Sequence, residues 1–404
     1  MPPAAPSLRQ NIRLLPRAAW VLYGGTFINR FGGFVAVFLV LYLTRRGYSP
    51  VQAGLAVAAF GAGSIPGSPI SGYLADRVGR RETLILASVM AAVFTMALAF
   101  ASSLPELIGL SALTGMASQM FRAPSMALLA DLVPVEHRMA ANGVMRMAIN
   151  LGFVAGPVAA GLLADRSFLF LFAGDAATSL AFGVIALLWL PRGAPGRDRP
   201  RVRGEGIRAI VSDRPFVVFL LASTVMSAVY AQTNSAFPLW VHDNGYNNAT
   251  YGALVGINGL TIVVLELFLI GYMQRFRTKP VIVVGFILVS VGFAATAFAH
   301  SIPLIALTVL TWTAGEMVAF PTSGVHVANI SPVHLRGRYQ AAWGLSWAIG
   351  WTLGPGLGSW IYERNRTLLW LSVGALGLVA TLIVAVTPGA SAVVPEGAVG
   401  AEAS

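Results

Sequence analysis

Residues 72–81 read Gly72-Tyr-Leu-Ala-Asp76-Arg77-Val-Gly79-Arg80-Arg81 and lie between two apolar runs, at 50–73 and 83–101. A helix needs about 20 apolar residues to cross a bilayer, and each run is close to that length. Glycine permits the tight turn that must join two such helices, and Asp and Arg side chains can bind opposite charges at neighbouring helix ends. The stretch therefore predicts two membrane-spanning helices joined by a charged turn.

The composition of the whole chain also indicates a membrane protein. Of its 404 residues, 27 are Lys or Arg and 16 are Asp or Glu, so only 11% are charged, and the mean hydropathy is +0.72. Soluble domains contain about 25% charged residues, which excludes that class. The chain has no cysteine, and this excludes disulfides, thiolate metal sites and a cysteine nucleophile.

Apolar runs bounded by charges, Pro or Gly recur along the chain and predict an all-α membrane protein with 12 transmembrane helices. The predicted spans are 18–43, 50–73, 83–101, 105–129, 140–164, 168–190, 214–241, 248–273, 280–299, 303–329, 338–361 and 367–387. An even number of spans places both termini on the same side of the membrane.

Basic residues are distributed unevenly between the two sides of the predicted membrane. With the N-terminus inside, most Lys and Arg residues fall on the inner side, around 9–17, 77–81, 138, 191–214, 275–279 and 336–338. The outer side then holds Arg45, Arg46, Arg166, Arg364 and Arg366. Cytoplasmic loops are enriched in Lys and Arg, so we expect both termini in the cytoplasm. This distribution accounts for the net charge of +11 without a nucleic-acid partner.

The two halves of the chain repeat each other at an offset of 198 residues. The matched positions include Leu41 and Leu239, Tyr48 and Tyr246, Gly54 and Gly252, and the pairs Gly156-Pro157 and Gly354-Pro355. Duplicated six-helix halves with the substrate between them are a known transporter architecture. We predict two pseudo-symmetric bundles, at 1–190 and 214–387, joined by a cytoplasmic linker at 191–213 and followed by a disordered tail at 388–404.

Residues 72–81 resemble the signature of the major facilitator superfamily, G-x-L-[AS]-D-[RK]-x-G-R-[RK], and lie in the expected loop between spans 2 and 3. The resemblance implies the twelve-helix fold of that superfamily. It also implies a gating latch on the cytoplasmic side that stabilises the outward-open state. The latch residues would be Gly72, Asp76, Arg77, Gly79, Arg80 and Arg81, with Asp131 at the end of span 4 as an acidic partner.

Span 5 contains a second motif, in which Gly152, Gly156, Pro157 and Gly161 are spaced as G-x-x-x-G-P-x-x-[GA]-G. This resembles a motif associated within the superfamily with antiporters, and it implies export. Span 11 repeats part of it at Gly354-Pro355. Small residues let helices pack closely, so helix packing alone also explains both copies.

Six ionisable residues lie within predicted spans, where placing each of them in the bilayer costs free energy unless it is paired or faces a cavity. They are Arg30, Arg122, Arg146, Asp175, Glu266 and Glu316. By analogy with the superfamily, spans 1, 4, 7 and 10 line the substrate cavity and spans 2, 5, 8 and 11 flank it. Glu316 is then the first candidate for proton coupling and Glu266 the second, with Asp175 as a structural partner. The alternative is that these groups pair with one another and move no proton.

Hydrogen-bonding and aromatic residues near these ions suit a small amphipathic substrate. The predicted cavity residues are Tyr23, Asn29, Arg30, Arg122, Arg146, Tyr230, Gln232, Asn234 and Trp312. A stripe of Trp343, Trp347 and Trp351 on span 11 has the spacing of one helix face and is assigned to packing.

The resemblance is strongest to bacterial drug–proton antiporters. It implies a monomeric, multi-pass protein of the bacterial cytoplasmic (inner) membrane that exports small amphipathic molecules, with the proton as coupling ion and no cofactor or metal. The soluble segments are too short for a catalytic site, so we expect no enzyme.

Two alternatives stay open at this stage. Asn29-Arg30-Phe31 is similar to a segment of proton-coupled peptide transporters, which would favour peptides or other zwitterions, although Asn29 replaces the acidic residue of that segment. The alternative of a different class is a membrane sensor that keeps the fold and transports nothing.

Overall fold

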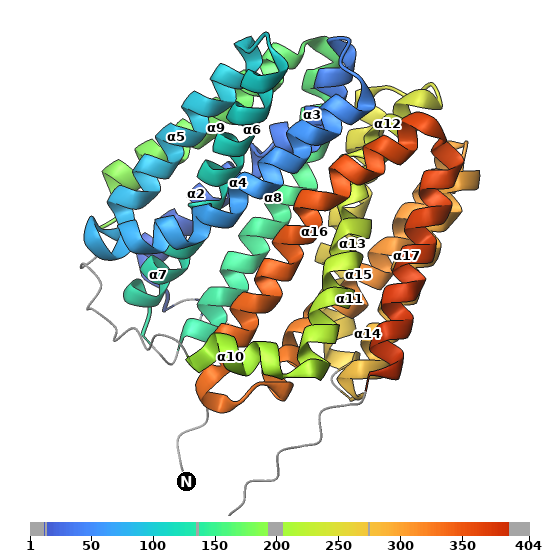
Figure 1. Cartoon of the computed structure of the whole chain (residues 1–404). Coiled ribbons are helices and arrows are strands. Elements are labelled where there is room, and N and C mark those ends of the chain that lie inside the picture. The colour runs from blue at the N-terminus through green and yellow to red at the C-terminus, as the bar shows by residue number, and fades with distance from the viewer. Residues whose placement is uncertain (1–11, 13, 135–136, 193–204, 274, 388–404) are drawn as a thin grey trace, which may run out of the picture.

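The computed structural model of the protein describes residues 12, 14–134, 137–192, 205–273 and 275–387, in which no strand is present (Figure 1). The helices of the N-terminal half are α2 (Arg17–Phe31), α3 (Val35–Arg45), α4 (Pro50–Arg77), α5 (Arg80–Phe100), α6 (Leu104–Gln119), α7 (Arg122–Leu132), α8 (Arg138–Arg166) and α9 (Phe168–Trp189). Those that follow are α10 (Glu205–Ser212), α11 (Arg214–Tyr230), the 3-10 turn η2 (Ala231–Asn234), α12 (Ala236–Asp243), α13 (Asn248–Met273), α14 (Thr278–Ala295) with the 3-10 turn η3 (Thr296–Phe298), α15 (Ile302–Ile330), the 3-10 turn η4 (Val333–Leu335), α16 (Arg336–Arg364) and α17 (Arg366–Val386).

The helix starts repeat at the offset found in the sequence. Five helices of the first half begin 198 residues before their counterparts: α4 and α13, α5 and α14, α6 and α15, α8 and α16, and α9 and α17. Both ends of α8 and α16 obey the same offset. The weak sequence repeat therefore corresponds to a repeat of structure.

Ten of the predicted spans correspond to helices that are long and apolar enough to cross a membrane. The predicted span 105–129 does not qualify because its helix is interrupted at residues 120–121 and forms the shorter α6 and α7. The predicted span 338–361 lies in α16, which is long enough but rich in Gly, Ser and Trp and so less apolar. The count of 12 spans stays a prediction.

Two further predicted spans are interrupted where the sequence predicts continuous helices. Span 1 breaks between α2 and α3, where a Cβ at Gly32 would collide with the Thr178 side chain and the carboxylate of Asp175 accepts a hydrogen bond from the Val35 amide at 3.0 Å. Span 7 breaks at η2, where the Gln232 amide donates to the carbonyl oxygen of Ala228, in the last turn of α11, at 3.1 Å. A buried polar side chain thus satisfies the backbone at or near each break, as a membrane interior requires.

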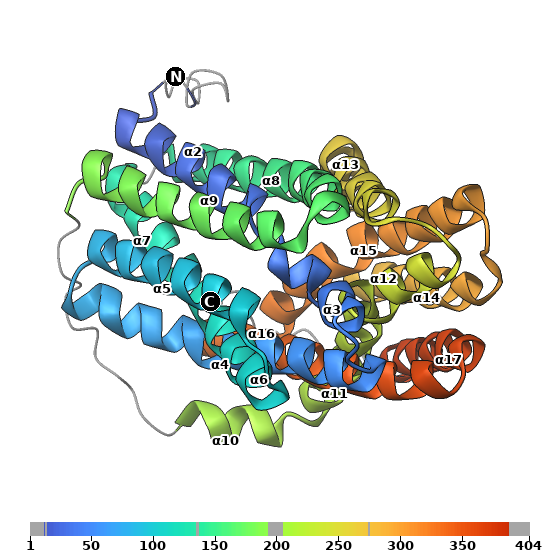
Figure 2. The same cartoon turned by 90° about the horizontal axis from the view of Figure 1, so that it is seen from above.

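The helices form two groups, α2–α9 and α11–α17, which lie side by side in Figures 1 and 2. The groups meet where α4 packs on α16 and where α8 packs on α13. Glycines permit this approach: a Cβ at Gly54 would lie 2.8 Å from the carbonyl oxygen of Pro355, and one at Gly252 would collide with that of Pro157. These two contacts are related by the 198-residue repeat.

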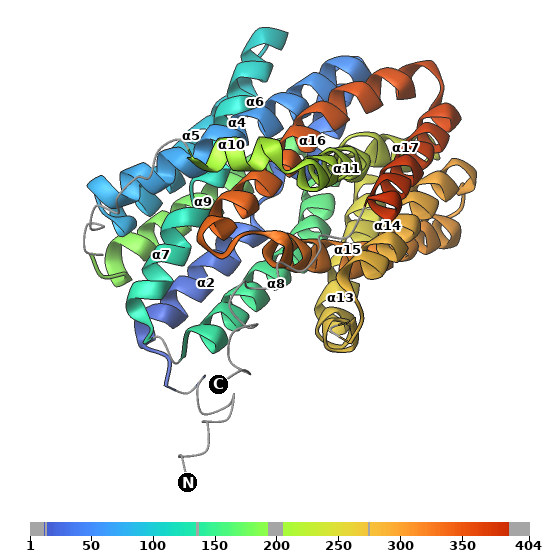
Figure 3. The same ribbon diagram turned by 60° about the horizontal axis from the view of Figure 1, so that its bottom comes forward.

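The turns between helices lie at two opposite ends of the molecule. We call one end the basic end; it holds the junctions after α4, α7, α9, α13 and α15, and α7 and α10 lie there in Figures 1 and 3. The other, which we call the closed end, holds the junctions after α3, α5, α8, α12, α14 and α16. The described part of the predicted linker 191–213 contains α10, whereas the predicted disordered tail lies outside the described residues.

Candidate substrate cavity

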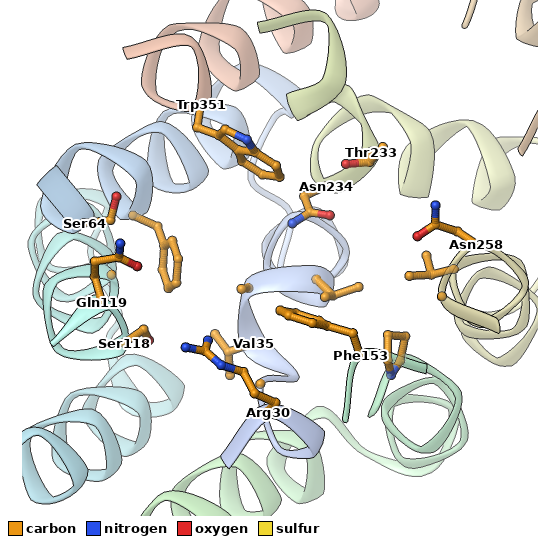
Figure 4. A pocket seen from close by; sticks show the side chains of 18 of the residues that line it. Arg30, Val35, Ser64, Ser118, Gln119, Phe153, Thr233, Asn234, Asn258 and Trp351 are labelled. Atoms are coloured by element: carbon orange, nitrogen blue, oxygen red, sulfur yellow. The ribbon is translucent and has the colours of Figure 1, made fainter. Parts of the chain in front are cut away.

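A cavity of about 630 Å³ lies between the two groups of helices and is lined by residues of both. Pockets for small molecules typically measure about 300–1,000 Å³, so the volume suits a drug-sized substrate. Figure 4 looks into it, with Ser64, Ser118 and Gln119 on one side and Asn258 on the opposite side. Of the residues predicted for the cavity or for proton coupling, those that line it are Asn29, Arg30, Arg146, Tyr230, Asn234, Glu266, Trp312 and Glu316.

Glu316 is held by hydrogen bonds from two other helices. The hydroxyl of Tyr230 on α11 donates to its Oε2 at 2.7 Å, and Nδ2 of Asn258 on α13 donates to the same oxygen at 2.9 Å. Nδ2 of Asn258 also lies 2.9 Å from Oγ1 of Thr313, one turn before Glu316. Hydrogen bonds to a charged group are stronger than neutral ones, so this carboxylate has a fixed orientation in the wall of the cavity.

Arg146 and Glu266 form an ion pair between the groups. Nη2 of Arg146 on α8 lies 2.5 Å from Oε1 of Glu266 on α13, and both residues line the cavity. The side chain of Glu266 is 11% exposed, whereas that of Arg146 is 55% exposed. The pair therefore combines a largely buried carboxylate with a more accessible cation.

Arg30 presents a positive charge to the cavity from the last turn of α2. Its guanidinium lies 5.9 Å from the ring centroid of Phe153, and it forms no ion pair with any residue in the described ranges. Gly152 brings α8 to this point, since a Cβ there would lie 2.6 Å from Cβ of Arg30. A cation stacked on an aromatic ring and lacking a counter-ion is suited to bind an anionic group of a ligand.

Other residues line the cavity without having been predicted for it. They include Gln119, Asn150, Phe153, Asn258 and Trp351, as well as Asp175, which was predicted to be a structural partner and binds the amide of Val35. Helical spacing could have identified Asn258, because it precedes Glu266 by two turns on the same face of α13, and Asn150 follows Arg146 by one turn. Trp351, which was assigned to packing, also contributes its ring to the cavity (Figure 4).

Three residues predicted for the cavity lie elsewhere. Tyr23 is 3% exposed and packs in the core of the first group, where its ring meets that of Trp20 edge to face. Arg122 begins α7 and is exposed, because the break before α7 redirects span 4. Gln232 is 2% exposed and donates to the carbonyl oxygen of Ala228 at the break in span 7 and to that of Gly354 on α16.

Known proteins share both this sequence pattern and this architecture. The sequence model of the Major Facilitator Superfamily matches residues 22–265 and 232–402. The chain belongs to the Major Facilitator Superfamily. It is 28% identical to the MFS-type transporter YqjV of Bacillus subtilis over 338 residues, which cover 81% of this chain and 82% of that protein. It is 23% identical to the multidrug resistance protein MdtH of Salmonella arizonae over 360 residues, with 87% and 89% covered.

Solved structures with little sequence identity share the superfamily fold. The nucleoside transporter NupG superposes with a TM-score of 0.80 at 13% identity, over 91% of this chain and 99% of that one. A POT family transporter in complex with 5-aminolevulinic acid gives 0.78 at 15% identity, over 92% and 96%. These likenesses show the fold and leave the substrate open.

The superfamily signature at 72–81 forms a turn at the basic end. Gly79 has a φ of +117°, which glycine adopts readily. Arg80 forms an ion pair with Asp131 and donates to the carbonyl oxygen of Ala127 at 2.8 Å. This is the partner proposed from the sequence, and both residues belong to the first group.

The other signature residues make different contacts. Arg77 stacks on the ring of Tyr73, 4.9 Å from its centroid, while Asp76 is exposed. Arg81 pairs with Glu82 at 3.3 Å, and a Cβ at Gly72 would meet open space. The gating role of this cluster stays a prediction.

The glycine motifs of α8 and α16 lie at helix contacts. Gly156 approaches the backbone of Phe31, and Gly161 approaches that of Asn248, with a Cβ at either position 2.6 Å from the carbonyl oxygen. Gly354 makes the same approach to Ala228 on α11. The motif therefore packs α8 against both groups, which agrees with the packing explanation of its two copies.

Proposed function

We propose that this member of the superfamily is a proton-coupled secondary transporter that exports small amphipathic molecules by alternating access. The proposal includes 12 spans in two bundles, both termini in the cytoplasm, and a monomer in the bacterial cytoplasmic membrane. The basic end would then face the cytoplasm. The closed end, where the two groups are in contact, would face outward, and the structure would then correspond to an inward-facing state.

The observation that supports this proposal best is the pair of carboxylates in the wall of a cavity between the two groups. Glu316 receives hydrogen bonds from Tyr230 and Asn258, and Glu266 is paired with Arg146. Ionisable residues at membrane depth are costly and are usually kept for ion or substrate movement. Both groups can accept a proton, and both are positioned to exchange it with a bound substrate.

Proton binding at Glu266 gives a physical route to coupling. Protonation removes the negative charge that attracts Arg146 and weakens a contact that joins α8 to α13. Protonation of Glu316 removes the negative charge to which Tyr230 and Asn258 donate, and it weakens these two hydrogen bonds. In both cases the cavity loses negative charge, which lowers its affinity for a substrate with a positive charge and favours release.

The names of two relatives support export and ion coupling. One relative is named as a multidrug resistance protein, and another, from Planococcus maritimus, as an Na(+), Li(+), K(+)/H(+) antiporter at 22% identity over 357 residues. They cover 87% and 80% of this chain, so the similarity includes both groups of helices.

Purified protein in liposomes with a trapped pH indicator tests the proposal. A lipophilic dye or antibiotic added under an imposed pH gradient should produce proton movement against the direction of substrate movement. Protein-free liposomes give the background. If no compound in a panel of drugs, peptides and other zwitterions moves protons, the transport proposal is wrong and the sensor alternative gains support.

A second candidate function is the transport of zwitterions such as short peptides. Arg30 from the first group and Glu316 from the second place one positive and one negative charge in the same cavity, which matches the two ends of a zwitterion. The same liposomes decide between the two candidates. Proton movement with di- and tripeptides, and none with lipophilic drugs, would replace drug export by zwitterion transport.

A further inference from the structure

Asp165 at the end of α8 caps a helix of the other group. Its Oδ1 accepts a hydrogen bond from the amide of Asn248 at 3.0 Å, and its Oδ2 accepts one from the amide of Ala249 at 3.1 Å. These are the first two amides of α13. The first amides of a helix have no partner within the helix and attract negative charge, so this carboxylate binds the positive end of α13.

Glu363 at the end of α16 makes the reciprocal contact. Its Oε2 accepts from the amide of Val51, the second residue of α4, at 3.2 Å. The offset of 198 residues relates Asp165 to Glu363 and Ala249 to Val51. In each group, a carboxylate at the end of one helix thus binds the start of a helix in the other group, and the two contacts are equivalent under the repeat.

Local caps satisfy the next amide in each helix. Oδ1 of Asn247 accepts from the amide of Thr250 at 3.0 Å, and Oγ of Ser49 accepts from that of Gln52 at 3.3 Å. The local capping residue therefore binds the later amide, and the earlier amides bind carboxylates of the opposite group. The two carboxylates are exposed, so their contacts with these amides can break without burying or uncovering a charge. When the closed end opens, the amides lose these hydrogen bonds and must bind water instead.

We propose that Asp165 and Glu363 form a reciprocal external latch that holds the closed end shut and sets the balance between inward-open and outward-open states. The latch proposal rests on the proposed alternating-access function. The two residues act through helix starts rather than through the substrate, so they are positioning residues. Their contacts exist in the closed arrangement because each joins α8 to α13 or α16 to α4.

The two arms of the latch are unequal for a reason visible in the sequence. The residue that corresponds to Asn248 is Pro50, which has no amide hydrogen. Asp165 consequently binds two amides and Glu363 binds one. We expect the Asp165 arm to contribute more to closure.

Spin labels at the closed end test the latch directly. The chain has no cysteine, so labels can be placed at Arg45 and Ser301, which are exposed and belong to different groups. In nanodiscs without substrate, D165A should raise the ratio of long to short inter-label distances about fivefold and E363A about twofold, as expected for loss of a helix cap. The double variant should raise it about tenfold. The variant D165K/E363K, which repels both helix starts, should make the long distance predominant.

Glu106 provides the matched control. Its carboxylate lies at the same end but accepts from the amides of Ser102 and Ser103 in its own group. E106Q should leave the distances unchanged, and an equal shift in E106Q would contradict the latch. Wild-type distances in D165A, E363A and D165K/E363K would overturn it, and a larger effect of E363A than of D165A would contradict the amide count. The distances are measured without transport. If the variants shift the distances but the protein moves no protons in liposomes, the proposed function is wrong and the latch is retained.

Discussion

Arg146 on α8 and Glu266 on α13 form an ion pair across the two groups of helices, with 2.5 Å between Nη2 and Oε1. Glu266 is the more buried partner, so the two single substitutions should differ. R146Q leaves a largely buried carboxylate without its counter-ion and should destabilise the protein by about 1–3 kcal/mol. E266Q leaves a half-exposed cation that water can solvate and should change stability by less than about 1 kcal/mol.

Thermal unfolding in detergent measures this difference. The control is the double variant R146Q/E266Q, in which no charge is left unpaired and most of the stability should return. Equal effects of the two single variants would show that the pair is solvated like a surface ion pair.

Glu316 should be required for proton-driven transport, whereas substrate exchange without a gradient should continue with a lower affinity. E316Q keeps a side-chain oxygen that can accept from Tyr230 and Asn258, so the shape of the cavity is preserved. We expect efflux driven by a pH gradient to fall to the level of protein-free vesicles, while exchange of labelled for unlabelled substrate without a gradient continues. E106Q is the control for loss of a distant carboxylate. Gradient-driven efflux at the wild-type rate in E316Q would assign coupling to another group.

The helices could be predicted from the sequence because membrane helices must be long, apolar and bounded by charge. The breaks at Gly32 and at η2 could not be predicted. Asp175, which binds the backbone at the first break, is distant in sequence, and the polar side chain of Gln232 at the second break is equally compatible with a place in the cavity. The exposed position of Arg122 follows from a third break, which no local signal in the sequence identifies. Charged cavity residues were easier to predict, since a lone Glu or Arg within an apolar run needs a reason to be there.

Neutral cavity residues were harder to predict than the ions. Asn258 and Asn150 are not costly enough at membrane depth to stand out in a sequence, and their roles depend on the face of the helix that meets Glu316 or Arg146. Gln232 shows the opposite error. It was selected for its polarity, yet the structure uses that polarity to satisfy the backbone.

Gly63 on α4 should be intolerant of a side chain. A Cβ at Gly63 would collide with the carbonyl oxygen of Ala112 on α6, and backbone atoms cannot move aside easily. G63A should therefore destabilise the first group by about 1–3 kcal/mol, the usual range for overpacking. G109A on α6 is the matched control, because a Cβ there meets nothing within 4 Å and alanine favours a helix by about 0.5–1 kcal/mol. Melting temperatures of the two variants should move in opposite directions, and a stable G63A would mean that α4 and α6 are less closely packed.

Arg30 should determine which substrate charges are accepted. Its guanidinium faces the cavity over Phe153 without an acidic partner in the described residues, so a substrate carboxylate or phosphate can supply the missing charge. R30Q should weaken the binding of substrates that contain an anionic group by about 10- to 100-fold, since a hydrogen bond to a charged group contributes about 1.5–3 kcal/mol. R30K keeps the charge but loses the planar group that stacks on the ring, so its effect should be intermediate.

Binding assays with pairs of compounds that differ only by esterification of a carboxylate measure the effect, and the ester serves as control because it should bind both proteins alike. Equal weakening for acid and ester would assign Arg30 to the architecture of the cavity, and the choice between cationic drugs and zwitterions would then depend on Glu316 and Glu266.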